Sequence, residues 1–193
     1  MNPAPWLWAH LQTALLLAAL AAWLAPRLGW RRGGALLLLA WLPLGQLDLT
    51  ARLVPYTGLL SLPGLALLAQ VSLRRWFGWE LLPDPDRRAL WLSLALTAAF
   101  LYPLALGLGP WDPYGWGYGG PWLALALSLM AAGHWWMGRH RLAVLLLAVI
   151  WAWLLRLGES DNAWDYLIDA WVAMAALVQL GLRRTPHAER MGD

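Results

Sequence analysis

The chain lacks two residue types altogether, cysteine and lysine, and it has few charged residues. The absence of cysteine from its 193 residues excludes disulfides, thiolate metal sites, iron–sulfur clusters and cysteine nucleophiles. All 14 basic residues are arginine, which excludes lysine Schiff bases and therefore a retinal protein of the usual kind. Charged residues make up 13% of the chain and apolar residues 61%, too little polarity to cover a soluble globule of this size. We therefore expect an integral membrane protein.

The sequence signatures of enzymes and metal sites are also missing. No glycine-rich phosphate loop follows a strand, and no serine has the G-x-S-x-G setting of a nucleophile. His10 and His134 are expected in opposite leaflets, so they cannot share a haem, and no histidine pair has a spacing useful for zinc. We predict no cofactor and no metal, with His10 plus nearby carboxylates as the one alternative. The arginines form no continuous basic face, so nucleic acid is not an expected partner.

What the sequence does contain is a series of apolar stretches, most of which end at arginines. A helix of ~20 residues, rising ~1.5 Å per residue, crosses the ~30 Å hydrocarbon core of a bilayer. The pattern predicts an all-α, polytopic transmembrane bundle that forms one integral membrane domain over residues 1–193. Its seven expected spans are 6–25, 33–50, 54–73, 89–108, 121–137, 141–157 and 163–182.

The second of these spans is the weakest. It contains Pro43 and Asp48, and the chain passes Pro55 before the next apolar stretch continues. Proline removes a backbone donor, so the helix is expected to kink near Pro43 and to break before Pro55. A bundle of six spans with a re-entrant hairpin over residues 43–58 is therefore the structural alternative.

The distribution of arginine predicts the orientation of the bundle. With the N-terminus outside, 12 of the 14 arginines lie in inner loops and the C-terminal tail, and only Arg52 and Arg156 lie outside. This is the asymmetry of the positive-inside rule, and tryptophans gather at both ends of the expected spans, as they do at membrane interfaces. We predict an N-terminus outside, a C-terminus in the cytoplasm, and a bacterial inner membrane as the location.

Acidic residues gather on the side that has few arginines. Asn162 is expected to cap the last span with Asp165 at its third position, in a capping-box-like arrangement. Asp161, Asp165 and Asp169 recur every fourth residue, which would place them along one helix face, with Asp169 two turns into the membrane. An ionisable group at that depth is a candidate functional residue. The outer loop 109–121, rich in glycine, proline and aromatics, is expected to be an interfacial cap, or else a binding lid.

These observations predict an outward-facing cluster of acidic, basic and polar side chains. Such a cluster either fixes helix register through buried ion pairs or binds a ligand or ion. Its expected members are Asp48, Arg52, Arg156, Asp165, Asp169, Tyr56, Asn162 and Tyr166.

The leading functional hypothesis is a small, multi-pass, non-enzymatic protein, either an accessory subunit or a carrier-like binder. Its outward-facing cluster would engage a membrane lipid, an ion or another membrane protein. One alternative is a membrane-embedded enzyme acting on a lipid-linked substrate at the outer leaflet, with Arg52 and Arg156 clamping a phosphate and Asp165 or Asp169 as general base. The other is a proton-coupled transporter in which Asp169 takes up and releases the proton.

Overall fold

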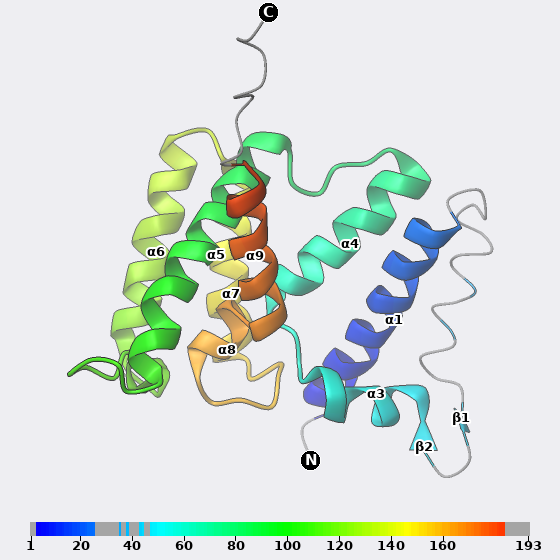
Figure 1. Cartoon of the computed structure of the whole chain (residues 1–193), viewed down its shortest axis with the longest axis horizontal. Helices are drawn as coiled ribbons and strands as arrows, with labels where there is room; N and C mark the ends of the chain where they lie inside the picture. Colours follow the sequence, from blue (N-terminus) through cyan, green and yellow to red (C-terminus); the bar gives the residue numbers. More distant parts are fainter. Residues whose placement is uncertain (1–2, 26–34, 36–37, 39–42, 45–46, 184–193) are drawn as a thin grey trace, which may run out of the picture.

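The computed structural model describes residues 3–25, 35, 38, 43–44 and 47–183, and this part of the chain is almost entirely helical (Figure 1). Its eight α-helices are α1 (Ala4–Leu24), α3 (Leu49–Thr57), α4 (Leu62–Phe77), α5 (Asp84–Ala105), α6 (Pro121–Trp136), α7 (His140–Leu154), α8 (Ala163–Leu167) and α9 (Ala170–Arg183). A short 3-10 helix, η3 (Tyr114–Gly117), lies between α5 and α6. Two-residue strands β1 (Pro43–Leu44) and β2 (Leu47–Asp48) pair antiparallel. The predicted all-α fold class is confirmed.

Two helices in the described part are long and apolar enough to cross a membrane, judged by length and composition. They are α1 with 21 residues and α5 with 22 residues. The helix α7 and residues 170–181 of α9 are apolar but shorter. Taken alone, two such helices are weak evidence of membrane association, because core helices of soluble proteins and signal sequences share these properties.

Two of the expected spans are interrupted, so their prediction as continuous helices was wrong. Within 54–73, α3 ends at Gly58, which has a φ of 65°, and a new helix begins after Ser61. Within 163–182, the helix ends at Leu167 and restarts at Ala170. The expected span 33–50 lies largely outside the described residues. In the 43–58 segment of the re-entrant alternative, the described residues form the β pair and the nine-residue α3.

The helices pack in pairs, and the bundle has two chemically different ends. The most extensive contacts are α6 along α7, α1 along α4, and α5 along α9. In Figure 1 the end of α4, the start of α5, the α6–α7 turn and the end of α9 lie at one end of the molecule. We call this the arginine end; its described arginines are Arg74, Arg75, Arg87, Arg88, Arg139, Arg141 and Arg183.

The opposite end contains the start of α1, α3, η3 and α8 (Figure 1), and we call it the acidic end. Its described acidic residues are Asp48, Asp112, Glu159, Asp161, Asp165 and Asp169, against the two arginines Arg52 and Arg156. The two ends therefore carry opposite charge patterns, in agreement with the grouping predicted from the sequence.

Apolar side chains fill both the interior and much of the surface. The buried core is made mainly of leucine and alanine, including Leu90, Leu94 and Leu146. The outer faces of the helices are apolar as well: the exposed large hydrophobic side chains include Leu92, Leu96, Phe100, Leu125, Leu129, Val144, Leu147, Trp151, Met174, Leu177 and Val178. These surfaces lie between the two charged ends of the bundle.

Candidate functional site

Asp169 lies in the break between α8 and α9, where it joins two helix starts. Its Oδ1 accepts a hydrogen bond from Val172 N at 2.9 Å, which caps α9. Its Oδ2 accepts from Ser61 N at 2.9 Å and from Ser61 Oγ at 2.7 Å, and Ser61 itself caps α4. The expectation that Asp169 lies two turns inside a helix, in line with Asp161 and Asp165, is therefore wrong. Its carboxylate instead ties α9 to α4.

The approach of α4 to Asp169 depends on a glycine. A Cβ added at Gly64 would lie 3.0 Å from Asp169 Oδ2 and 2.9 Å from Val172 Cγ2. Any larger residue would push the start of α9 away from α4.

Asp165 belongs to a second network, which joins α8 to the loop before α6. Its carboxylate accepts hydrogen bonds from the Tyr114 hydroxyl at 3.0 and 3.1 Å and from the Ser160 hydroxyl. Burial, and next the negative charge of Asp165, raise the pKa of the Tyr114 phenol well above its usual value, so Tyr114 stays a donor. Asp165 therefore fixes the loop. In the expected capping box its carboxylate would accept from the backbone N–H of Asn162, but that N–H donates to Ser160 Oγ instead.

Asn162 and Tyr166 complete the same network. Asn162 is fully buried; its side chain accepts from Trp164 N at 3.0 Å and donates to Tyr114 O at 3.0 Å, which confirms it as the cap of α8. The Tyr166 hydroxyl donates to Ser160 O and accepts from Gly158 N, both at 3.0 Å. Trp164 Nε1 also donates to Pro113 O at 2.8 Å. Polar atoms of α8 and of its cap thus hold the loop against α8 at residues 113–114.

Asp48 pairs with His10, which the sequence analysis considered only as part of an alternative metal site. Its Oδ2 lies 3.1 Å from Nε2 of the buried His10, while its Oδ1 caps α3 by accepting from Ala51 N at 2.7 Å. The other ring nitrogen of His10 lies 2.9 Å from Trp6 O. The pair joins α1 to α3. Among the described residues no group of three or more potential metal ligands converges.

The two arginines of the predicted cluster lie on the surface. Arg156 pairs with Asp161 at 3.2 Å, with both side chains largely exposed. Arg52 and Tyr56 lie on exposed positions of α3. The structure therefore distributes six of the eight predicted residues among separate networks around Asp48, Asp165, Asp169 and Arg156. It places the other two, Arg52 and Tyr56, at the surface of α3.

Two polar residues that join helices, Gln12 and Ser61, were not predicted as such from the sequence. Gln12, buried in α1, donates to Thr57 Oγ1 and Gly58 O and accepts from Leu60 N at 2.7 Å. A single glutamine in an apolar stretch indicates a buried polar contact, but the sequence does not indicate which residues it contacts. Ser61 was detectable as a helix start, because a serine cap followed by proline is a typical beginning.

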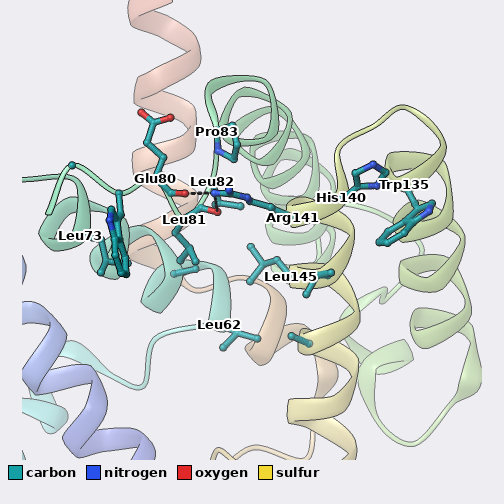
Figure 2. Close-up of a pocket in the computed structure, with 15 residues that line it drawn as sticks. Leu62, Leu73, Glu80, Leu81, Leu82, Pro83, Trp135, His140, Arg141 and Leu145 are labelled. Carbon is teal, nitrogen blue, oxygen red and sulfur yellow. Dashed lines mark hydrogen bonds between the residues drawn. The ribbon is translucent and has the colours of Figure 1, made fainter.

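One open space in the described part of the chain lies between α4 and α7, towards the arginine end (Figure 2). This cleft of about 1070 Å³ is lined by Leu62, Leu73 and Leu145, among others, and by the 78–83 connection. Arg141 extends from α7 and donates to the carbonyl oxygens of Glu80 and Leu81, the latter at 3.3 Å. Its guanidinium thus holds the 78–83 connection over one end of a mainly apolar cleft.

A second open space, the α4–α9 groove, lies on another face of α4. It has a volume of about 750 Å³ and is lined mainly by apolar side chains. Its lining residues are Leu16, Thr57, Leu60, Gly64, Leu67, Leu68, Gln70, Val71, Arg74, Arg87, Trp91, Trp171, Val172, Ala175 and Gln179. The helices of the pair α1–α4 thus form one side, and those of the pair α5–α9 the other.

Comparisons with protein-family models, with curated proteins and with solved structures give no match for this chain. The candidate site therefore rests on geometry, and the geometry offers two apolar spaces beside α4 and a set of internally bonded polar networks.

Proposed function

We propose that this chain is a non-enzymatic, multi-pass membrane protein that acts as a carrier-like binder and holds a membrane-resident molecule beside α4. The observation on which the proposal rests is the pair of open, leucine-lined spaces, about 1070 and 750 Å³, on two faces of α4. Ligand pockets commonly measure about 300–1,000 Å³ and are mostly apolar. Spaces of this size and lining suit an acyl or prenyl chain.

The membrane setting is supported by the surface of the bundle. Monomeric soluble proteins rarely expose contiguous apolar patches larger than a few hundred Å². Here the outer faces of α5, α6, α7 and α9 all expose large hydrophobic side chains. The charged groups gather at the two ends, with the arginines mainly at one of them. The proposed orientation has the arginine end in the cytoplasm of a bacterium and the acidic end outside.

The bonding of the partly buried carboxylates Asp165 and Asp169 favours a binder over the other functional classes. Asp165 and Asp169 already accept hydrogen bonds from the fold itself, from Tyr114, Ser160, Ser61 and a backbone N–H. A general base or a proton carrier needs its carboxylate directed towards a substrate or water. The enzyme and proton-coupled transporter hypotheses are therefore the less favoured alternatives.

The absence of cysteine makes a direct test of the orientation possible. Single cysteines are introduced as Asp112→Cys at the acidic end and as Arg75→Cys and His140→Cys at the arginine end. An impermeant thiol reagent added to intact cells is expected to label position 112, and to label positions 75 and 140 only after permeabilisation. Labelling of 75 or 140 in intact cells, with none at 112, would overturn the proposed orientation.

Binding is tested by counting the lipids that stay bound to the purified protein in native mass spectrometry. Ala148→Trp fills the α4–α7 cleft and Ala175→Trp fills the α4–α9 groove, whereas Val178→Trp adds the same side chain to an exposed position outside both. We expect retained lipid in the parent and in Val178→Trp, and reduced retention in each filled variant. A parent protein that retains no lipid, and instead copurifies with one other membrane protein, would favour the accessory-subunit hypothesis.

A further inference from the structure

We infer that the α4–α9 groove binds an anionic phospholipid, whose phosphate lies between Arg74 and Arg87 and whose acyl chain runs along α4. The inference rests on the proposed function and names the ligand class for one of its two spaces. It assigns the phosphate to the arginine end of the bundle, away from the outward-facing residues predicted from the sequence.

Three helices place polar side chains at the same end of the groove. The helix α4 contributes Gln70 and Arg74, four residues apart and therefore on one face, and α5 contributes Arg87 from its first turn. The helix α9 contributes Gln179, near its end. All four line the same groove, and Figure 1 shows that α4 and α9 end, and α5 begins, at the arginine end.

Gln70 supplies a second, independent indication of a ligand. Its side chain is 4% exposed and its Oε1 accepts from Leu82 N at 2.8 Å. Its Nε2 is buried and has no hydrogen-bond partner among the described residues. A buried donor without an acceptor costs free energy, so an acceptor oxygen from a bound headgroup would relieve it.

The rest of the groove is lined almost entirely by apolar side chains. Gly64, Leu67, Leu68 and Val71 follow one face of α4, and Trp171 and Ala175 lie opposite on α9. From Gly64 to Arg74 the helix rises about 15 Å, half of the ~30 Å hydrocarbon core. This length accommodates an acyl chain that runs from the arginines along α4 towards its start beside Asp169.

Both arginines have carboxylate neighbours, so a bound phosphate and a carboxylate would contact the same guanidinium group. Arg74 lies 3.7 Å from Glu80, with the two side chains 57% and 39% exposed, and Arg87 pairs with Asp84 within one turn. The Arg74–Glu80 pair is exposed and therefore weak. Each guanidinium has five N–H donors, enough for a phosphate and a carboxylate together. In the α4–α7 cleft, by contrast, Arg141 donates to backbone carbonyls. The α4–α9 groove is therefore the better phosphate site.

The test compares two phospholipids with identical acyl chains, phosphatidylglycerol and phosphatidylcholine, titrated into the delipidated full-length protein in detergent and counted by native mass spectrometry. Arg74→Gln with Arg87→Gln removes the arginines that line the groove. Arg75→Gln with Arg88→Gln removes the same charge from the adjacent positions, which do not line it. Circular dichroism and thermal unfolding confirm that each variant folds.

We expect one phosphatidylglycerol bound per chain, with an apparent affinity about tenfold or more above that of phosphatidylcholine. The preference is lost in the groove pair of variants and kept in the adjacent pair. Glu80→Gln with Asp84→Asn is expected to raise the affinity for phosphatidylglycerol, because it frees the two guanidinium groups.

Equal losses in both arginine pairs would mean general attraction to the charged end and would overturn the inference. Equal binding of the two lipids, abolished by Ala175→Trp, would also overturn it, while leaving the proposed binder function intact. Failure of both lipids to bind, together with no effect of Ala175→Trp or Ala148→Trp, would reject the binder function as well.

Discussion

Replacement of Asp169 by asparagine is expected to destabilise the bundle markedly although it leaves the side-chain shape unchanged. The carboxylate accepts three hydrogen bonds, two from Ser61 and one from Val172 N. An asparagine in this position has one oxygen and one NH₂ group. If the oxygen caps α9, the NH₂ group faces Ser61 N–H, and if it is flipped, the NH₂ group faces Val172 N–H. Either orientation leaves a backbone donor without an acceptor.

The magnitude follows from the type of bond that is lost. Hydrogen bonds to a charged group contribute about 1.5–3 kcal/mol each, and an unsatisfied backbone N–H costs about 1–3 kcal/mol. Since the rotating Ser61 hydroxyl can adapt but the backbone N–H groups cannot, Asp169→Asn is expected to lower the free energy of unfolding by roughly 2–4 kcal/mol. Asp161→Asn is the matched control: its partner is Arg156 and its side chain is 67% exposed. Its expected cost is at most about 1 kcal/mol.

The assay is denaturant unfolding of the purified protein in a mild detergent, followed by tryptophan fluorescence and repeated in a double-mutant cycle with Ser61→Ala. A coupling free energy of about 1 kcal/mol or more is expected between Asp169 and Ser61. If Asp169→Asn is no more destabilising than Asp161→Asn, or if the cycle shows no coupling, the hydrogen bonds at the junction between α4 and α9 do not stabilise the fold.

Three other perturbations test separate parts of the structure. Gly117→Ala would place a Cβ 1.7 Å from Asn162 Oδ1, so thermal unfolding should occur at a clearly lower temperature, whereas Gly181→Ala, with open space around it, should leave it unchanged. Gln12→Leu removes three hydrogen bonds to residues 57–60 and should cost about 2–4 kcal/mol in denaturant unfolding; a loss below about 0.5 kcal/mol would contradict this. Burial and a nearby carboxylate raise the pKa of Tyr114, so the folded state favours the neutral phenol. This stabilisation is complete below about pH 10 and is lost as the pH rises through the raised pKa. In a spectrophotometric titration, Tyr114→Phe should remove the latest-ionising tyrosine, and an unchanged curve would count against the contact.

The sequence allowed the helical class, the charge polarity of the bundle and one helix cap to be predicted. Arginine clusters mark helix ends because a charged group is costly in an apolar environment, and this rule is independent of tertiary contacts. The cap at Asn162 was equally local, because a short polar side chain before an apolar run satisfies the first free N–H groups. Both predictions depend on residues close together in the chain.

The arrangement of the acidic end could not be predicted in the same way. The spacing of Asp161, Asp165 and Asp169 matches a continuous helix, but Asp169 forms a new cap after Leu167 because Ser61, 108 residues away in the chain, offers it two donors. The buried Gln12 likewise finds its partners 45 to 48 residues away. Such pairings depend on how the helices pack against one another, which the periodicity of apolar residues does not predict.

The modest length of four of the helices has a consequence for the surrounding lipid. The helices α4 and α6 have 16 residues, α7 has 15 and α9 has 14, which corresponds to about 21–24 Å along their axes. A bilayer with a ~30 Å hydrocarbon core would have to thin around them, or their ends would draw water and headgroups inward. In the proposed setting, this hydrophobic mismatch would shorten the distance between the leaflets around the protein and favour its partition into thinner regions of the bilayer.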